Sequence, residues 1–112
     1  MMLKTGGINM YTEYIKSLNP KILLITPLRK KDNISLKTKE SMMKNSVSFD
    51  WISFASKNNP VINCKKALNK YKRKYHLPDY IMKLDNDIDG DSGWLDSMYN
   101  ALEDSPDSVA YA

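Results

Sequence analysis

The chain has 112 residues and a formal net charge of +4, with 42% hydrophobic and 27% charged residues. This length fits a single domain, and this composition is typical of a soluble globular protein. The single cysteine, Cys64, excludes an intrachain disulfide and a cysteine-rich zinc site. No apolar run approaches the ~20 residues that cross a membrane, and the opening "MMLKTGGINMYTEY" lacks the apolar core of a signal peptide. We therefore expect a soluble, cytoplasmic protein.

Residues 1–19 are predicted to form an N-terminal extension that is partly helical. After the pair Gly6-Gly7, which breaks regular structure, apolar residues recur at helical spacing at Ile8, Tyr11, Ile15 and Leu18. Asn19-Pro20 ends this segment, because the residue before a proline avoids the helical conformation. Residues 20–112 are then expected to form the domain itself.

From residue 20 onward, apolar runs alternate with amphipathic segments. Strands are predicted at residues 21–26, 49–55, 80–84 and 108–112. Helices are predicted over residues 34–45, 60–76 and 94–102. Because strands alternate with helices, the connections should be right-handed crossovers between parallel strands. We predict an α/β, Rossmann-like fold with a mostly parallel four-stranded sheet and about three flanking helices.

Two of these helices have predicted starts and inward faces. Asp32 or Asn33 is expected to cap the first helix, with its core-facing residues at Leu36, Met42 and Met43. Asn59 followed by Pro60 is a favourable start for the second helix. The predicted buried stripe of that helix is Ile62, Cys64, Leu68, Tyr71 and Tyr75.

Residues 85–96 gather five aspartates directly after a predicted strand, in a chain that is basic overall. In parallel sheets, ligands bind beyond the carboxyl ends of the strands, and this segment should lie there. One interpretation is a solvated turn, with Asp89 and Asp91 exposed and Asp91 or Ser92 capping the next helix. That interpretation explains Asp85 least well, because a carboxylate at the end of a buried strand loses hydration.

A calcium loop is the second interpretation. Five residues match the ligand and glycine positions of an EF-hand-like loop, namely Asp85, Asp87, Asp89, Gly90 and Asp96. Such a loop needs a helix that enters it, whereas the preceding residues predict a strand.

The third interpretation is a divalent metal site for a diphosphate. Asp85 and Asp87 stand at positions i and i+2, and two carboxylates at the end of a strand can share one octahedral ion. Such an ion, Mn²⁺ or Mg²⁺, can neutralise a diphosphate and act as a Lewis acid on a departing nucleotide.

The order of these motifs resembles the glycosyltransferases of the GT-A fold, family-two type. Asp85-Asn86-Asp87 resembles their Asp-any-Asp motif, and Gly93-Trp94-Leu95-Asp96 resembles the Trp-Leu pair that follows it. Upstream, "LLITPLRK" is similar to the opening strand, "SLKTKESMMKNSV" to the first helix, and "NNPVINCKKALN" to an asparagine-containing stretch before the motif. The resemblance spans residues 21–112.

This resemblance implies that the chain binds a nucleotide-diphosphate sugar. Asp87 and Asp85 would bind the metal, and Asp85 would also contact ribose or sugar hydroxyls. The implied donor-binding residues are Asp85, Asn86, Asp87, Thr26, Pro27, Arg29, Asn63 and Trp94. No catalytic residue and no acceptor is assigned.

Two departures from the family pattern shape this expectation. Ala55 and Ser56 stand where an acidic residue usually contacts the uracil, so the nucleotide is left unassigned. The sequence stops at Ala112, where the family's acceptor half would follow. We therefore expect a donor-binding half that transfers no sugar alone and that self-associates or has a partner completing its fold.

The predicted helix over 60–76 is strongly basic and also contains two tyrosines. Its cations are Lys65, Lys66, Lys70, Lys72, Arg73 and Lys74. We expect a solvated basic face with Tyr71 and Tyr75 in the core. A nucleic-acid-binding module is the alternative, in which lysines contact phosphates and tyrosines stack on bases.

Overall fold

The computed structural model describes residues 10–29 and 32–104. Its elements, in chain order, are β1 (Met10–Ile15), β2 (Ile22–Arg29), α1 (Leu36–Met42), β3 (Phe49–Ser56), α2 (Pro60–Lys72), β4 (Tyr80–Lys83) and α3 (Trp94–Asp104). No helix within the described ranges is long and apolar enough to span a membrane.

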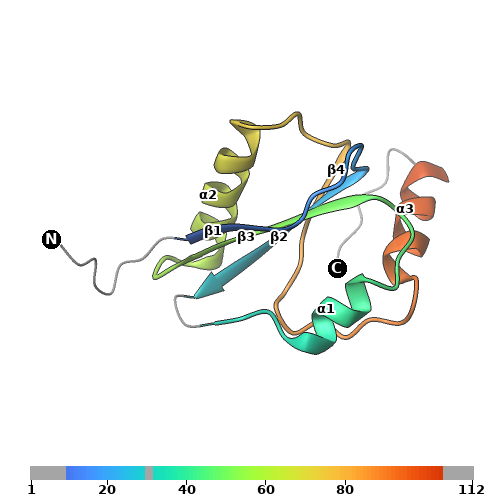
Figure 1. Ribbon diagram of the computed structural model, residues 1–112, viewed down its shortest axis with the longest axis horizontal. Coiled ribbons are helices and arrows are strands. Elements are labelled where there is room, and N and C mark those ends of the chain that lie inside the picture. The colour runs from blue at the N-terminus through green and yellow to red at the C-terminus, as the bar shows by residue number, and fades with distance from the viewer. Residues whose placement is uncertain (1–9, 30–31, 105–112) are drawn as a thin grey trace, which may run out of the picture.

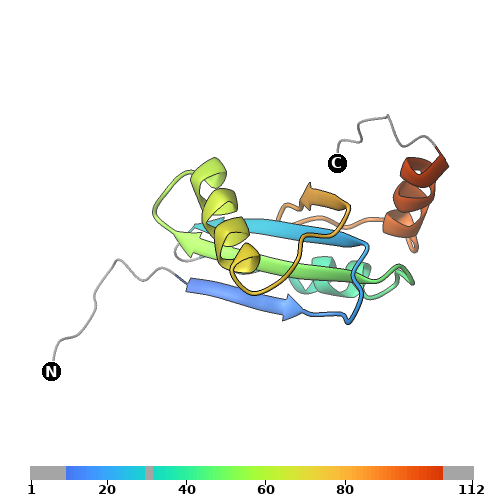
Figure 2. The ribbon, with the colours of Figure 1, turned by 90° about the horizontal axis from the view of Figure 1, so that it is seen from above.

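The four strands form one mixed sheet in the order β1-β3-β2-β4 (Figures 1 and 2). β2 is parallel to both β3 and β4, while β1 is antiparallel to β3. The continuous apolar run Ile22–Ile25 lies in the central strand β2 and is buried, as a strand covered on both faces requires. The predicted α/β fold with a mostly parallel four-stranded sheet and three helices is confirmed.

The fourth strand differs from the expected one. It is β1, whereas the predicted strand at 108–112 lies outside the described residues. The helical prediction was wrong for residues 10–15, which form a strand paired with β3. A bulge between Glu13 and Ile15 then turns Tyr11 and Ile15 to opposite sides of the sheet. This segment therefore belongs to the sheet and is not separate from the domain.

Each face of the sheet has its own apolar core. α2 covers one face and packs on Leu23, Ile25 and Ile52 through Ala67 and Tyr71. The opposite core contains Ile22, Leu24, Trp51, Met42 of α1 and Leu95 of α3. Figure 1 shows α2 above the sheet, α1 below it and α3 at one end, where Leu95 of α3 joins the core on the α1 side.

The helix starts and inward faces were predicted only in part. Asn59 caps α2 as predicted, accepting a hydrogen bond from the backbone N–H of Ile62 at 2.9 Å. Ser35, and neither Asp32 nor Asn33, caps α1. In α1, Met42 is buried, but Leu36 and Met43 are 70% and 68% exposed, because Thr38 and Ser41 occupy the packed face instead. In α2, Ile62 is 38% exposed and Asn63 is buried in its place.

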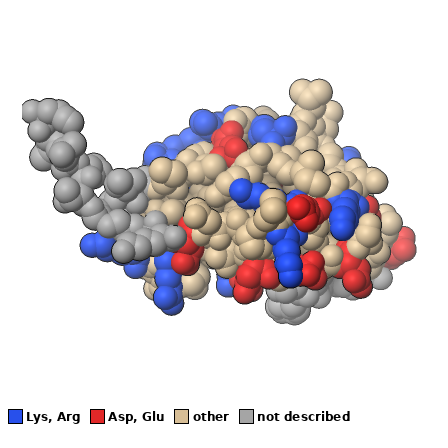
Figure 3. Space-filling view, turned by 60° about the horizontal axis from the view of Figure 1, so that its bottom comes forward, with Lys and Arg blue, Asp and Glu red and all other residues tan. Residues whose placement is uncertain are grey.

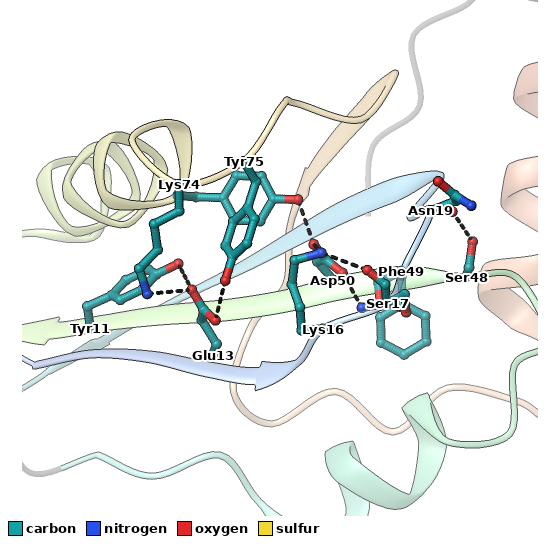
Figure 4. Close-up of polar contacts among 11 residues, drawn as sticks. Tyr11, Glu13, Lys16, Ser17, Asn19, Ser48, Phe49, Asp50, Lys74 and Tyr75 are labelled. Carbon is teal, nitrogen blue, oxygen red and sulfur yellow. Dashed lines mark hydrogen bonds and ion pairs between the residues drawn. The ribbon is translucent and has the colours of Figure 1, made fainter.

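Asp50 is a fully buried carboxylate at the start of β3. It accepts hydrogen bonds from the backbone N–H of Ser17 at 2.7 Å and from the Tyr71 hydroxyl at 2.6 Å. The ammonium of Lys16 lies 3.0 Å from the same oxygen that accepts from Tyr71 (Figure 4). A buried charge is tolerated only when paired and hydrogen-bonded, and these contacts supply both conditions.

Asp50→Asn should destabilise the fold, because the amide keeps the size but removes the charge and places N–H groups against donors. We expect a loss of about 2–4 kcal/mol in the free energy of unfolding, measured by urea denaturation at pH 7. Asp104→Asn, on the exposed end of α3, is the control and should change stability by less than about 0.5 kcal/mol. Equal stability of the two variants would show that Asp50 does not hold the fold together.

Candidate functional site

The aspartate-rich segment, residues 85–93, follows the carboxyl end of β4. Lys83 is the register partner of Ile25, and the backbone N–H of Leu84 still donates to the Ile25 carbonyl at 2.8 Å. Asp85 is therefore the first residue after the last hydrogen bond between β4 and β2. This is the edge of the sheet at which parallel α/β folds bind ligands.

Hydroxyl groups of α1 hold the backbone of this acidic loop. The Thr38 hydroxyl lies 2.7 Å from the Ile88 carbonyl and 3.2 Å from that of Asn86. The Ser41 hydroxyl lies 3.0 Å from the Gly90 carbonyl, and the Gly90 N–H donates back to it at 3.1 Å. The N–H of Ser35 adds a bond of 2.9 Å to the Asn86 carbonyl. The N-cap Ser35 and two residues of α1, Thr38 and Ser41, thus contact the loop at every second residue, namely Asn86, Ile88 and Gly90.

This attachment decides which side chains of the loop face solvent. Asp85, Asp87, Asp89 and Asp91 are exposed, and they alternate with partly buried neighbours, of which Ile88 packs against the core. The Asp85 side chain is 60% exposed and lies 3.6 Å from the Lys83 ammonium. Figure 3, which brings the bottom of Figure 1 forward, shows acidic side chains on this part of the surface with basic ones beside them.

Asp96 has a different position from the other aspartates. Its carboxylate accepts hydrogen bonds from the backbone N–H groups of Ser46 and Val47, at 2.6–2.9 Å. In return, the Asn45 side-chain oxygen accepts from the N–H groups of Leu95 and Asp96 at 2.9 and 3.2 Å, which caps the start of α3. Asp96 therefore joins α3 to the loop between α1 and β3.

The calcium-loop interpretation finds no support in this arrangement. A strand, β4, enters the loop where a helix is required, and Asp96 is engaged by backbone N–H groups. Among residues 10–29 and 32–104, no three His, Cys, Asp or Glu side chains gather in a group that would hold a metal ion.

Trp94 lies directly over the loop. A Cβ atom on Gly90 would come within 2.4 Å of the Trp94 ring, so the glycine is what allows the indole to pack there. The indole N–H of Trp94 is buried and has no hydrogen-bond partner among the described residues. Gly93, with φ of 76°, makes the left-handed turn that starts α3.

The remaining predicted donor-binding residues fall into two groups. Pro27 and Arg29 lie at the carboxyl end of β2, where Arg29 is exposed. Thr26 and Asn63 are buried and engaged within the protein. Thr26 accepts from the Trp51 indole N–H at 2.9 Å. The Asn63 amide donates to the carbonyl of Leu28 at 2.9 Å and also accepts from the Ser56 hydroxyl. The side chains of Thr26 and Asn63 are therefore buried and hydrogen-bonded within the protein, and neither faces a ligand at this edge.

The residues that attach the loop to α1 were not identified from the sequence. The signal for them is the spacing of Ser35, Thr38 and Ser41 in "SLKTKES", three residues apart on one face of a helix. Because hydroxyl residues at such spacing are also common on solvated faces, the spacing alone names no partner.

No protein-family model, no curated protein and no solved structure matches this chain.

Thr38→Val should loosen the acidic loop, because the buried hydroxyl is replaced by a methyl group of similar shape and the Ile88 carbonyl loses its donor. We expect a loss of about 1–3 kcal/mol in stability and faster amide hydrogen exchange at residues 86–90. Thr38→Ser keeps the hydroxyl and should leave that exchange slow. Unchanged exchange in Thr38→Val would mean that the α1 hydroxyls do not order the loop.

Proposed function

We propose that this chain binds a nucleotide-diphosphate sugar through a divalent metal ion at Asp85 and Asp87. In this proposal it acts as the donor-binding part of a glycosyltransferase of the kind that the sequence resembles. The supporting observation is the position of the two carboxylates. Both are exposed directly beyond the carboxyl end of β4, on a loop that α1 hydroxyls hold in place.

In this proposal, Mg²⁺ or Mn²⁺ would be held at this edge together with a diphosphate, because carboxylate oxygens are ligands that such cations take. Asp85 and Asp87 flank Asn86, whose carbonyl accepts two bonds from the α1 side, and both aspartates are exposed. Hard cations of this kind commonly take one or two carboxylates, several waters and substrate phosphate oxygens. When bound, such an ion neutralises the diphosphate and stabilises the departing nucleotide.

The chain's own residues have distinct parts in this proposal. Asp87 provides a metal ligand, and Asp85 provides a second ligand or contacts the donor's hydroxyl groups. The Lys83 ammonium, 3.6 Å from Asp85, limits the net negative charge at this edge. Arg29 adds an exposed positive charge at the end of β2, where it can attract phosphate.

Asn86 and Trp94 support the loop. The Asn86 amide N–H donates to the Asn33 carbonyl at 3.2 Å, which ties the centre of the motif to the segment before α1. The Trp94 indole packs on Gly90 and so covers the loop from the α3 side.

The test is the mutual effect of metal and nucleotide on binding, measured by calorimetry. Because the ion would bridge protein and phosphate, Mn²⁺ and a nucleoside diphosphate should each strengthen the other's binding about five-fold or more. Several nucleoside diphosphates should be compared, since the base is unspecified. Asp87→Asn should abolish this mutual effect without unfolding the chain.

Asp89→Asn is the matched control, because Asp89 is an equally exposed aspartate on the same loop. The mutual effect should persist in this variant. Loss of Ca²⁺ binding in both variants, with no effect of nucleotide, would instead support the calcium loop. Absence of any coupling in the unmodified chain would refute the proposed site.

A further inference from the structure

A hollow of about 350 Å³ lies between α2 and the β1 side of the sheet. It is lined by Tyr11, Phe54, Lys66, Asn69, Lys70 and Arg73. It exists because α2 packs mainly on β2 and β3, whereas β1 extends the sheet beyond them, as Figure 2 shows. This hollow is on the face opposite α1 and the acidic loop.

The floor of the hollow is aromatic. Tyr11 and Phe54 are register partners on β1 and β3, and Tyr11 is the more accessible of the two, since Phe54 is only 4% exposed. The Tyr11 hydroxyl donates to a Glu13 carboxylate oxygen at 2.9 Å, which fixes the position of the ring (Figure 4). Burial and this hydrogen bond raise the pKa of Tyr11 above its usual value, so the ring stays neutral.

The wall of the hollow is basic. Lys66, Lys70 and Arg73 are at positions i, i+4 and i+7 along α2 and its C-cap, so they share one face and span about 10 Å along the axis. Within the described residues, none of the three lies within ion-pair distance of a carboxylate. The Lys66 ammonium is 5.6 Å from the centre of the Phe54 ring.

Glu13, two residues from Tyr11 on β1, does not neutralise this wall. Glu13 is engaged by the hydroxyls of Tyr11 and Tyr75, at 2.9 and 3.0 Å, and by the Lys74 ammonium at 3.4 Å. Burial raises the pKa of Glu13, but these hydrogen bonds outweigh it and hold that pKa below its usual value. The Glu13 charge is therefore balanced locally, and the three cations remain available.

We propose that this hollow binds single-stranded nucleic acid. Lys66, Lys70 and Arg73 would contact successive phosphates, since the row they form is longer than one phosphate group. A base would stack on the Tyr11 ring, which every base can do through its π face. Asn69, at the same wall, offers an amide for hydrogen bonds. A base must leave its duplex to reach a recessed ring, so a single strand fits better than a double helix.

The tyrosines of the basic segment do not form this floor, and Tyr71 lies in the core as the sequence predicted. Tyr71, on α2 itself, is fully buried and bonded to Asp50, and the Tyr75 hydroxyl is bonded to Glu13. The aromatic floor comes instead from two strands, and only the pairing of β1 with β3 brings it under the basic face of α2.

Fluorescence anisotropy with labelled single-stranded DNA and RNA of mixed sequence tests the proposal. EDTA should be present, so that the result does not depend on any metal site. Three neutralised phosphates predict that log K falls with log salt concentration with a slope of about −2. The triple variant Lys66→Ala/Lys70→Ala/Arg73→Ala should bring this slope close to zero.

A second triple variant, Lys57→Ala/Lys65→Ala/Lys72→Ala, removes the same charge from exposed positions outside the hollow. It should keep most of the affinity and of the salt dependence. Equal loss in both triple variants would mean that binding reflects diffuse charge, and would overturn the proposal. Undetectable binding by the unmodified chain at low salt would also overturn it.

The role of the ring is tested by Tyr11→Leu and Tyr11→Phe, which both lose the hydroxyl and differ in aromaticity. Tyr11→Phe should bind like the unmodified chain, whereas Tyr11→Leu should bind about five-fold more weakly or worse. Equal affinities of these two variants would exclude stacking on Tyr11. Tighter binding of the matching duplex than of the single strand would contradict the proposed ligand.

Discussion

The buried carboxylate of Asp50 joins three segments that are far apart in the sequence. It binds the backbone of Ser17 between β1 and β2, the Lys16 ammonium beside it, and the Tyr71 hydroxyl near the end of α2. Burying a charge costs several kcal/mol unless its partners are in place. The position of β1 beside β3, and that of α2 across the sheet, are therefore linked through one side chain at the start of β3.

The contacts of Asp50 lie at the amino end of β3. The acidic loop lies at the other edge of the sheet, where the parallel strands have their carboxyl ends. On one face, β1 extends the sheet past α2, which leaves an aromatic floor under a basic helix. On the other, the hydroxyls of α1 hold the acidic loop with its aspartates outward. The two proposed sites thus lie on opposite faces and carry opposite charge. Neither requires the other to be occupied.

Strong local patterns explain why β2, β3, β4 and the three helices could be predicted. The apolar run of β2 and the Asn59-Pro60 start of α2 can each be recognised from a few neighbouring residues. β1 could not be predicted in this way, because its pairing with β3 is long-range and a bulge between Glu13 and Ile15 interrupts the alternation of a strand. Asn63 was assigned to a donor site, but tertiary contacts place its amide between β2 and β3. The acidic loop was located correctly, whereas its attachment to α1 depends on contacts about fifty residues apart.

The position of a bound ion tests the proposed metal-diphosphate site most directly. Mn²⁺ is paramagnetic, so it broadens the NMR signals of amides close to it. When Mn²⁺ is added in small amounts with a nucleoside diphosphate, the amide signals of residues 85–88 should broaden first. Those of residues 66–73, on the opposite face, should stay sharp. Broadening centred on other acidic residues, such as Glu103 and Asp104 at the end of α3, or spread evenly over the chain, would contradict a site at Asp85 and Asp87.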